Sequence, residues 1–339
     1  MQDAHLHPAI LAEIARNHGL LSRARALEIG LDDRDLRRLV RCGVLVVIRR
    51  GMYARREDVE RLEPYVGRRQ LEARAAWQGL TRDEFALSHD SSAAFQGIAT
   101  LRPSTPLVHV TRLGPPRART RYGVKRHQSP VMDEHLVAHD GLVLLDPART
   151  AVDIAREHGL VPGVVAIDSA RQQGVELTDL RAAVEPMWRW PNVTTARAAI
   201  ELSDRGAESP GETLLRLLLV ELGLGPIESQ FEICDDTRTA RCDLRVGRHL
   251  FEFDGHAKYQ RIERGGLARD PDEVVWDEKQ RQDWLLGYHL GMSRVIWADC
   301  WVPRRDATLR RLMREFELTC GRFGTSIDDL AHLVVRRAA

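Results

Sequence analysis

The pattern of apolar and polar positions predicts short helices and a hairpin at the start of the chain. Apolar residues recur there at helical spacing, and an N-cap serine, Ser22, separates the first two runs. The β-rich stretch that follows is broken by the turn Arg49-Arg50-Gly51. The expected elements are a helix over 8–17, a helix over 23–29, a helix over 31–43, and strands over 44–48 and 52–54. This order is typical of a winged helix.

The pattern changes twice further along the chain. The middle region mixes strands with helices, and the elements expected there are a helix over 93–98, strands over 106–110 and 142–145, a helix that begins at Pro147, and helices over 161–173 and 178–184. The last region is expected to contain a helix over 208–222, strands over 230–234, 241–246 and 250–255, a helix over 274–290, a strand over 293–297 and a helix over 307–318. We therefore predict a multidomain α+β protein with domains over 1–70, 71–200 and 201–339.

The overall charge is balanced. The chain has 339 residues, with 50 Lys and Arg against 49 Asp and Glu, so its formal net charge is +1. This balance excludes a uniformly basic, histone-like protein and a charged disordered chain, although it allows a local basic patch. Lysine is rare, with Lys125, Lys258 and Lys279 as its three occurrences. Each lysine is therefore a position of interest, because a compact ammonium and a guanidinium differ in chemistry.

Cysteine usage and hydropathy bear on the cellular compartment. The five cysteines are scattered and include no C-x-x-C pair, which argues against a disulfide framework and a zinc ribbon. No apolar run approaches the length of a membrane-spanning helix, and the first residues do not resemble a secretory signal. We expect a soluble protein of a reducing cytoplasm, without a membrane partner.

The balanced total hides a basic cluster in the first domain. Eight arginines and one acid lie between Arg34 and Arg56, and four of the arginines recur at helical spacing opposite Leu36 and Leu39. A basic helix face followed by a basic hairpin tip suits the DNA major groove and its flanking phosphates. The alternative is an ordinary solvated helix face. The candidate DNA-binding residues are Arg34, Arg37, Arg38, Arg41, Arg49 and Arg50.

Four carboxylates form the candidate chemical site in the last domain. Glu212 lies on the first helix, Asp243 begins a strand, and Glu252 and Asp254 are two apart on the next strand. Residues two apart on a strand share a face. Ionised carboxylates on a buried strand are costly unless a cation or a metal compensates them, so the pattern predicts a site for Mg²⁺ or Mn²⁺ that supports phosphodiester hydrolysis. The alternative is a buried ion-pair network without metal.

Each candidate residue has an expected role. Asp243 and Glu252 would hold the metal, and Glu212 would complete the acidic site or bind a second ion. Asp254 and Lys258 would position water, and Lys279 would contact phosphate. A different pairing, His89 with Ser91, is better explained by a helix N-cap than by nucleophilic catalysis. No phosphate-binding or dinucleotide-binding glycine motif is present, so the sequence does not support the use of ATP or NAD.

The motifs of the last region carry a resemblance to a known superfamily. They are Glu212, Asp243, the E-F-D-G strand over 252–255, Lys258-Tyr259, the helix over 278–283, Gly291 and the strand over 294–297. With these motifs the chain resembles the restriction-endonuclease-like, or PD-(D/E)XK, superfamily, and within it the families related to very-short-patch-repair endonucleases. The resemblance implies an α/β domain with a mixed central sheet flanked by helices. The third motif of that superfamily usually ends in lysine, and here Asp254 occupies the position.

Residues of about 10–200 carry a second resemblance. The motifs are the segments 36–43 and 51–54, Leu87-Ser88-His89, Val108-His109-Val110-Thr111 and the segment 147–153. They resemble the AbiEi-type antitoxin and transcriptional-regulator family. This resemblance implies DNA binding through the winged helix, often with autorepression, and no cofactor.

Two functional hypotheses follow. The first is a DNA-binding protein with a magnesium-dependent endonuclease domain, acting in phage defence or DNA repair. The second is a non-catalytic AbiEi-like antitoxin or autorepressor whose nuclease fold is degenerate, and Asp254 in place of lysine favours it. The expected partner is double-stranded DNA, with a toxin or defence protein and a homodimer as further options. RNA stays open as a substrate, because an arginine face does not identify the sugar.

Overall fold

The computed structural model describes residues 6–80, 85–113, 119–255 and 271–335. The chain divides into two compact units, and each is described here by itself. The first unit comprises Met1–Ala166 and Val175–Ile200, and the second comprises Ile167–Gly174 and Glu201–Ala339. The last stretch of the first unit ends at Ile200, and residue 70 lies inside a helix of that unit. None of the helices in the described ranges is long and apolar enough to cross a membrane.

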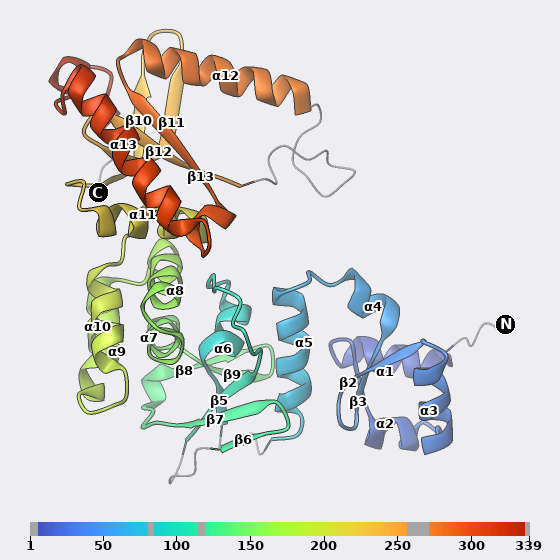
Figure 1. The fold of residues 1–339 in the computed structure, drawn as a ribbon. Helices are drawn as coiled ribbons and strands as arrows, with labels where there is room; N and C mark the ends of the chain where they lie inside the picture. Colours follow the sequence, from blue (N-terminus) through green and yellow to red (C-terminus); the bar gives the residue numbers. More distant parts are fainter. Residues whose placement is uncertain (1–5, 81–84, 114–118, 256–270, 336–339) are drawn as a thin grey trace. The chain divides into compact units, whose positions relative to one another are not determined.

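The first unit begins with a helical bundle that packs against a small sheet (Figure 1). The three strands are antiparallel and lie in the order β1-β3-β2. Leu21, Leu36 and Leu45 are buried in one core that ties the helices to the sheet. The elements are α1 (Pro8–Arg16), β1 (Leu20–Ser22), α2 (Arg23–Glu28), α3 (Asp33–Arg41), β2 (Leu45–Arg49) and β3 (Met52–Arg55).

Two helices follow this bundle. They are α4 (Arg56–Arg61) and α5 (Val66–Trp77). Leu71 and Ala75 of α5 pack against Leu20 and Met52 of the small sheet, so α5 shares a core with the bundle. Trp77 at the other end of α5 belongs to the core of the next sheet. Helix α5 therefore contributes to both cores of the first unit.

A six-stranded mixed sheet forms the rest of the first unit, in the order β6-β7-β5-β4-β9-β8. Pairs β4/β9 and β5/β7 are parallel, and the other pairs are antiparallel. The strands are β4 (Phe85–Leu87), β5 (Val108–Arg112), β6 (Arg119–Arg121), β7 (Val124–Gln128), β8 (Leu136–His139) and β9 (Leu142–Leu145). The helices are α6 (His89–Gln96), α7 (Pro147–His158), α8 (Leu160–Gln172), α9 (Leu177–Val184) and α10 (Val193–Glu201), with 3₁₀ turns over Asp133–His135 and Glu185–Met187. From Ile167 onward, α8 belongs to the second unit.

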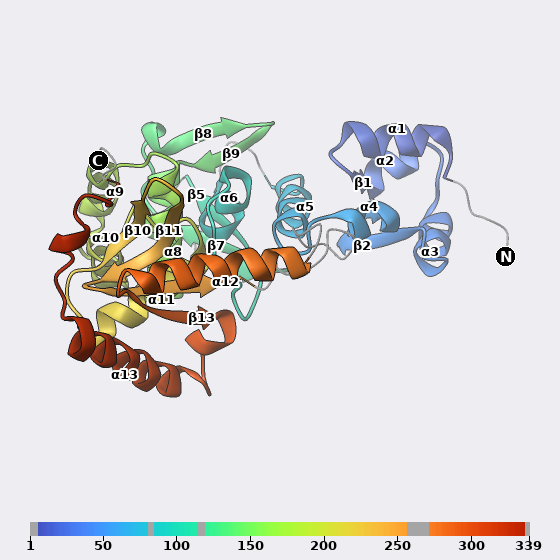
Figure 2. The ribbon, with the colours of Figure 1, turned by 90° about the horizontal axis from the view of Figure 1, so that it is seen from above.

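The second unit is built on a four-stranded sheet in the order β10-β11-β12-β13 (Figure 2). The first three strands are antiparallel, and β13 runs parallel to β12. The elements are α11 (Pro210–Leu222), β10 (Glu228–Cys234), β11 (Thr239–Val246), β12 (His249–Asp254), α12 (Pro271–Gly287), β13 (Gly291–Ile296) and α13 (Arg305–Phe323), with 3₁₀ turns over Trp297–Cys300 and Asp328–Leu330. The chain is thus a mixed α/β protein with several sheets.

Helices α12 and α11 pack on this sheet through different contacts. Leu285 of α12 is buried with Phe231 and Leu250. Gly211 of α11 lies so close to the ring of Phe253 that a Cβ placed there would be 2.2 Å from it. This close approach brings the first turn of α11 against β12, and with it the glutamate that follows Gly211.

Candidate nucleic-acid interface and acidic site

The basic helix α3 is held firmly at its start. Asp32 caps the helix through the backbone N–H groups of Arg34 and Asp35, both 2.7 Å from its Oδ1. The side chain of Asp35 in turn accepts from the Asp32 N–H, which completes a capping box. Leu36 and Leu39 are buried in the core of the bundle. The helix therefore presents its remaining side to solvent in a fixed orientation.

We call the exposed side chains Arg34, Arg37, Arg38 and Arg41 the α3 arginine face. Arg38 pairs with Asp35 at 3.3 Å. Two further acids lie nearby: Asp33 is bound by Arg23 at 2.6 Å, and Asp32 caps the helix. Within the described ranges, the side chains of the other three arginines form neither a hydrogen bond nor a close ion pair. The face therefore carries three guanidinium groups that are available to an anionic partner.

The two arginines of the β2–β3 turn differ in exposure. Arg50 is exposed, whereas Arg49 is half-buried, and burial lowers the pKa of its guanidinium. Gly51, with φ +76°, supplies the left-handed conformation that closes the turn. Arg50 is thus the more accessible of these two predicted DNA-binding residues.

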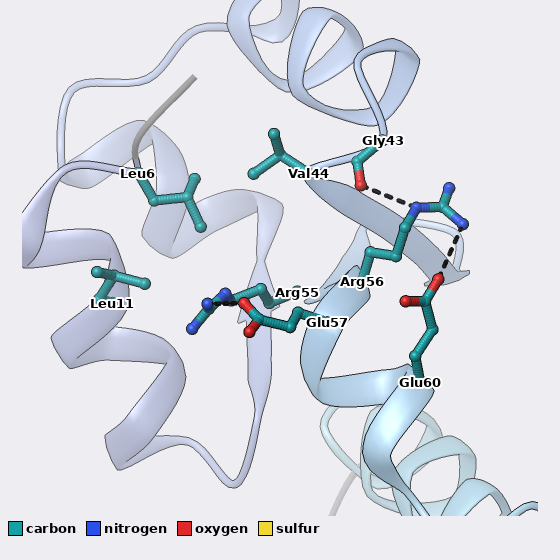
Figure 3. A pocket seen from close by; sticks show the side chains of 8 residues that line it. All are labelled: Leu6, Leu11, Gly43, Val44, Arg55, Arg56, Glu57 and Glu60. Atoms are coloured by element: carbon teal, nitrogen blue, oxygen red, sulfur yellow. Dashed lines mark hydrogen bonds and ion pairs between the residues drawn. The ribbon is translucent and has the colours of Figure 1, made fainter. Parts of the chain in front are cut away.

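The last two arginines of the basic cluster are engaged within the fold. Arg56 donates to the carbonyl oxygen of Gly43 at 2.8 Å and lies 3.8 Å from Glu60 (Figure 3). Arg55 pairs with Glu57. These groups line a pocket of about 560 Å³ together with Leu6, Leu11 and Val44. Their charges are neutralised locally, which separates them from the α3 arginine face.

In the second unit, Glu212 and Asp243 lie near each other at the start of α11. Glu212 is buried and accepts hydrogen bonds from the Glu208 N–H at 2.8 Å, the Ser209 hydroxyl at 2.8 Å and the Gln230 amide at 2.7 Å. Burial raises the pKa of Glu212, and the negative charge of Asp243 contributes to the increase. Asp243 accepts from the backbone N–H of Phe253 at 2.7 Å.

Glu252 is enclosed by two arginines. Its carboxylate pairs with Arg281 of α12 and, at 3.3 Å, with Nε of Arg294, its neighbour on β13. Both arginines also pair with Glu278, so the four side chains form one network. We call them the Glu252 network; they line a pocket of about 210 Å³ that Asp243 and Asp254 also line. The network shows that the charge of Glu252 is compensated by the protein itself.

The remaining predicted site residues lie apart from this network. One carboxylate oxygen of Asp254 is buried and has no hydrogen-bond partner among the described residues. Lys279 is exposed on α12. Lys258 lies outside the described residues.

The arrangement bears on the expected Mg²⁺ or Mn²⁺ site. Among the described residues, Glu212, Asp243, Glu252 and Asp254 do not form a group of three whose ligand atoms lie within 4.8 Å of one another. The oxygens of Glu252 already face two guanidinium groups. A hard cation needs several oxygen ligands around it. In this arrangement the four carboxylates do not fit that requirement.

Two sets of polar residues were not anticipated by the sequence reasoning. Arg281 and Arg294 lie in segments whose motifs the sequence analysis named. Their pairing with Glu252 was not predicted, because it brings together α12, β13 and β12. A group of histidines, His89, His109 and His127, gathers in the first unit. Ser91, considered beside His89, lies inside α6, whose N-cap is Ser88, and it accepts from the backbone N–H of His109 on β5 at 2.9 Å.

Comparison with known proteins gives one family match. Residues 8–56 match the family model described as "Transcriptional regulator, AbiEi antitoxin". None of the curated proteins matches the chain. Among solved structures, the Rv2827c protein from Mycobacterium tuberculosis is 18% identical, with a TM-score of 0.37, over 61% of this chain and 79% of that one. The segment that contains α1–α3 and the small sheet is therefore similar to AbiEi-type antitoxin and transcriptional-regulator domains.

Proposed function

We propose that the protein is a DNA-binding transcriptional regulator of the antitoxin type, which contacts double-stranded DNA through the α3 arginine face. The observation that carries the proposal is the set of exposed guanidinium groups on Arg34, Arg37 and Arg41. They lie on one helix inside the segment that matches the regulator model, and among the described residues their side chains form no hydrogen bond or close ion pair. Clustered basic groups on one helix are the electrostatic footprint of a nucleic-acid interface.

The local order of elements supports this role. Three helices and a three-stranded antiparallel sheet, ending in the β2–β3 hairpin, support the proposal of a winged helix in which α3 acts as the recognition helix. The exposed Arg50 at the hairpin tip is placed to contact a phosphate beside the groove. Binding of a toxin and pairing with another copy of the chain both remain predictions.

The second unit is proposed to act as a non-catalytic module of this regulator. Arg281 and Arg294 compensate Glu252, so that residue needs no metal to be stable where it is. Asp254 occupies the position of the expected lysine, which removes a group that would assist cleavage. Both features agree with a nuclease-like fold that has been kept for binding.

A matched pair of double variants tests the DNA contact. Arg37→Ala with Arg41→Ala removes two exposed charges one helical turn apart on α3. We expect it to weaken binding of duplex DNA from the region upstream of the gene by about tenfold to a hundredfold, because each lost contact costs about 1 kcal/mol. Fluorescence anisotropy with a labelled duplex measures the affinity.

The control for this experiment is Arg310→Ala with Arg314→Ala on α13. These arginines are also exposed and four residues apart, so the net charge changes equally. We expect the control to bind within about twofold of the wild type. Equal losses in the two double variants, or no loss in the α3 variant, would contradict the proposed interface.

A metal-dependent endonuclease is the second candidate function. Its support is the order α11, β10–β12, α12, β13, with Asp243 beside Glu212 and the unpartnered oxygen of Asp254 at the same pocket. Incubation of plasmid and linear DNA with Mg²⁺ or Mn²⁺ tests it. Cleavage by the wild type that is lost in both Asp243→Ala and Asp254→Ala would establish this function; intact DNA throughout is the outcome expected of the regulator.

A further inference from the structure

Three neighbouring strands of the six-stranded sheet bring histidines together in the first unit. His89 directly follows β4 at the start of α6, His109 lies on β5, and His127 lies on β7. In the parallel pairing of β5 with β7, Thr111 is opposite His127, so His109 and His127 are two positions apart and share a face of the sheet. We call these three side chains the histidine cluster.

The rings are close enough to share one ligand. Nδ1 of His109 lies 2.9 Å from Nε2 of His127, and the rings of His89 and His127 are stacked with centroids 3.8 Å apart. One nitrogen from each of the three rings lies within 4.8 Å of the other two. Ligand nitrogens of a tetrahedral zinc ion are about 3.3 Å apart, given Zn–N bonds of about 2.0 Å. The rings of His89 and His127 are stacked at an interplanar angle of 21°, so side-chain rotation has to turn their lone pairs toward one point before they share an ion.

The three imidazoles differ in exposure. His89 and His109 are buried, and His127 is half-buried. A neutral imidazole keeps one nitrogen with a lone pair, and this is the form that binds metals.

The buried carboxylate of Asp90 lies near His109 of the cluster. Oδ2 of Asp90 is 3.9 Å from Nε2 of His109, on the side of the ring away from the His127 contact. Asp90 is itself held by His158 at 2.5 Å and by Arg69 at 3.5 Å. The 3.9 Å contact is longer than a hydrogen bond, so a shift of the His109 ring toward Asp90 is needed to form the hydrogen bond by which carboxylates orient histidines in many zinc sites.

We propose that His89, His109 and His127 bind one divalent cation of the zinc class, with Asp90 as a positioning residue for His109. Neutral imidazoles suit Zn²⁺, Cu²⁺ or Ni²⁺, whereas Mg²⁺ and Ca²⁺ prefer oxygen ligands. Three histidines leave a fourth position for water, on the side where His127 is partly open to solvent. The overlapping group of Asp90, His109 and His158 is the weaker choice, because Asp90 is already engaged by Arg69 and His158.

The experiment uses the full chain after treatment with EDTA. Isothermal titration with ZnCl₂, followed by dialysis and metal analysis, is expected to show about one bound ion per chain and no binding of MgCl₂ at the same concentration. His127→Gln, at the most accessible ligand, is expected to lower the affinity by at least a hundredfold. His139→Gln, an exposed histidine of the same unit, is the matched control and is expected to bind like the wild type.

A second readout separates loss of the site from loss of the fold. Bound metal stabilises the folded state, so Zn²⁺ is expected to raise the Tm of the wild type and of His139→Gln but not that of His127→Gln. Circular dichroism verifies that His127→Gln is folded before titration. Absence of zinc binding by the wild type, or undiminished binding by both His127→Gln and His109→Gln, would overturn the proposal.

Discussion

Arg281→Met is expected to lower the free energy of unfolding of the second unit by about 2–3 kcal/mol. Arg281 joins the Glu252 network to β11, because it pairs with Glu252 and Glu278 and donates to the carbonyl oxygen of Arg241 at 3.2 Å. Methionine keeps most of the side-chain volume but removes the charge. Two carboxylates, only 12% and 25% exposed, would then share one remaining arginine, Arg294.

Chemical denaturation followed by hydrogen exchange in the strands β11–β13 measures this change within the second unit. Arg241→Met serves as the control, because Arg241 pairs with the half-exposed Glu208 and such a pair contributes less than about 1 kcal/mol. An equal loss of unfolding free energy in both variants would contradict this account, and so would no loss in Arg281→Met. Either result would mean that Arg281 does not compensate the negative charges of Glu252 and Glu278.

Acidification is expected to destabilise the second unit through His249. This residue is buried, with Nδ1 2.7 Å from the Thr319 hydroxyl and Nε2 2.8 Å from the Ser293 hydroxyl, and Glu315 is the nearby charged group. Burial lowers the pKa of His249 to about 4, against about 6.5 in an unfolded chain. The unfolded state therefore binds the proton more readily between these two values.

The sign of the effect follows from proton binding. Above pH 6.5 the contribution of His249 to stability is fully present, and it is lost as the pH falls toward 4, with a total of about 3 kcal/mol. Denaturation at a series of pH values between 7 and 4 measures the slope. His249→Gln keeps a polar side chain but does not titrate, so its slope should be smaller by about one proton in this range. An unchanged slope in that variant would rule out His249 as the source.

Local signals in the sequence predicted much of the fold. Ser22 does cap a helix, and the strand Leu142–Leu145 and the start of α7 at Pro147 agree with the expected bounds. These elements have strong caps or apolar runs, which act within a few residues. Strand β1 was not expected, because three residues are too few to show alternation, and its pairing with β3 comes from the fold.

The site was only partly predictable for a related reason. The residues of the α3 arginine face follow from helical spacing, and the structure places all four at the surface. The partners of Glu252 come from α12 and β13, about 30 and 40 residues away, and no spacing rule links them to β12. The histidine cluster likewise depends on the neighbouring positions of β4, β5 and β7, which the sequence pattern does not reveal.

The salt dependence of DNA binding tests the central claim most directly. Each phosphate contact adds about 0.9 to the slope of log Kd against log salt concentration. The account predicts that Arg37→Ala with Arg41→Ala lowers this slope by about 2 relative to the wild type, while Arg310→Ala with Arg314→Ala leaves it unchanged. Equal slopes for the wild type and the α3 variant would contradict the claim that the α3 arginine face binds the DNA backbone.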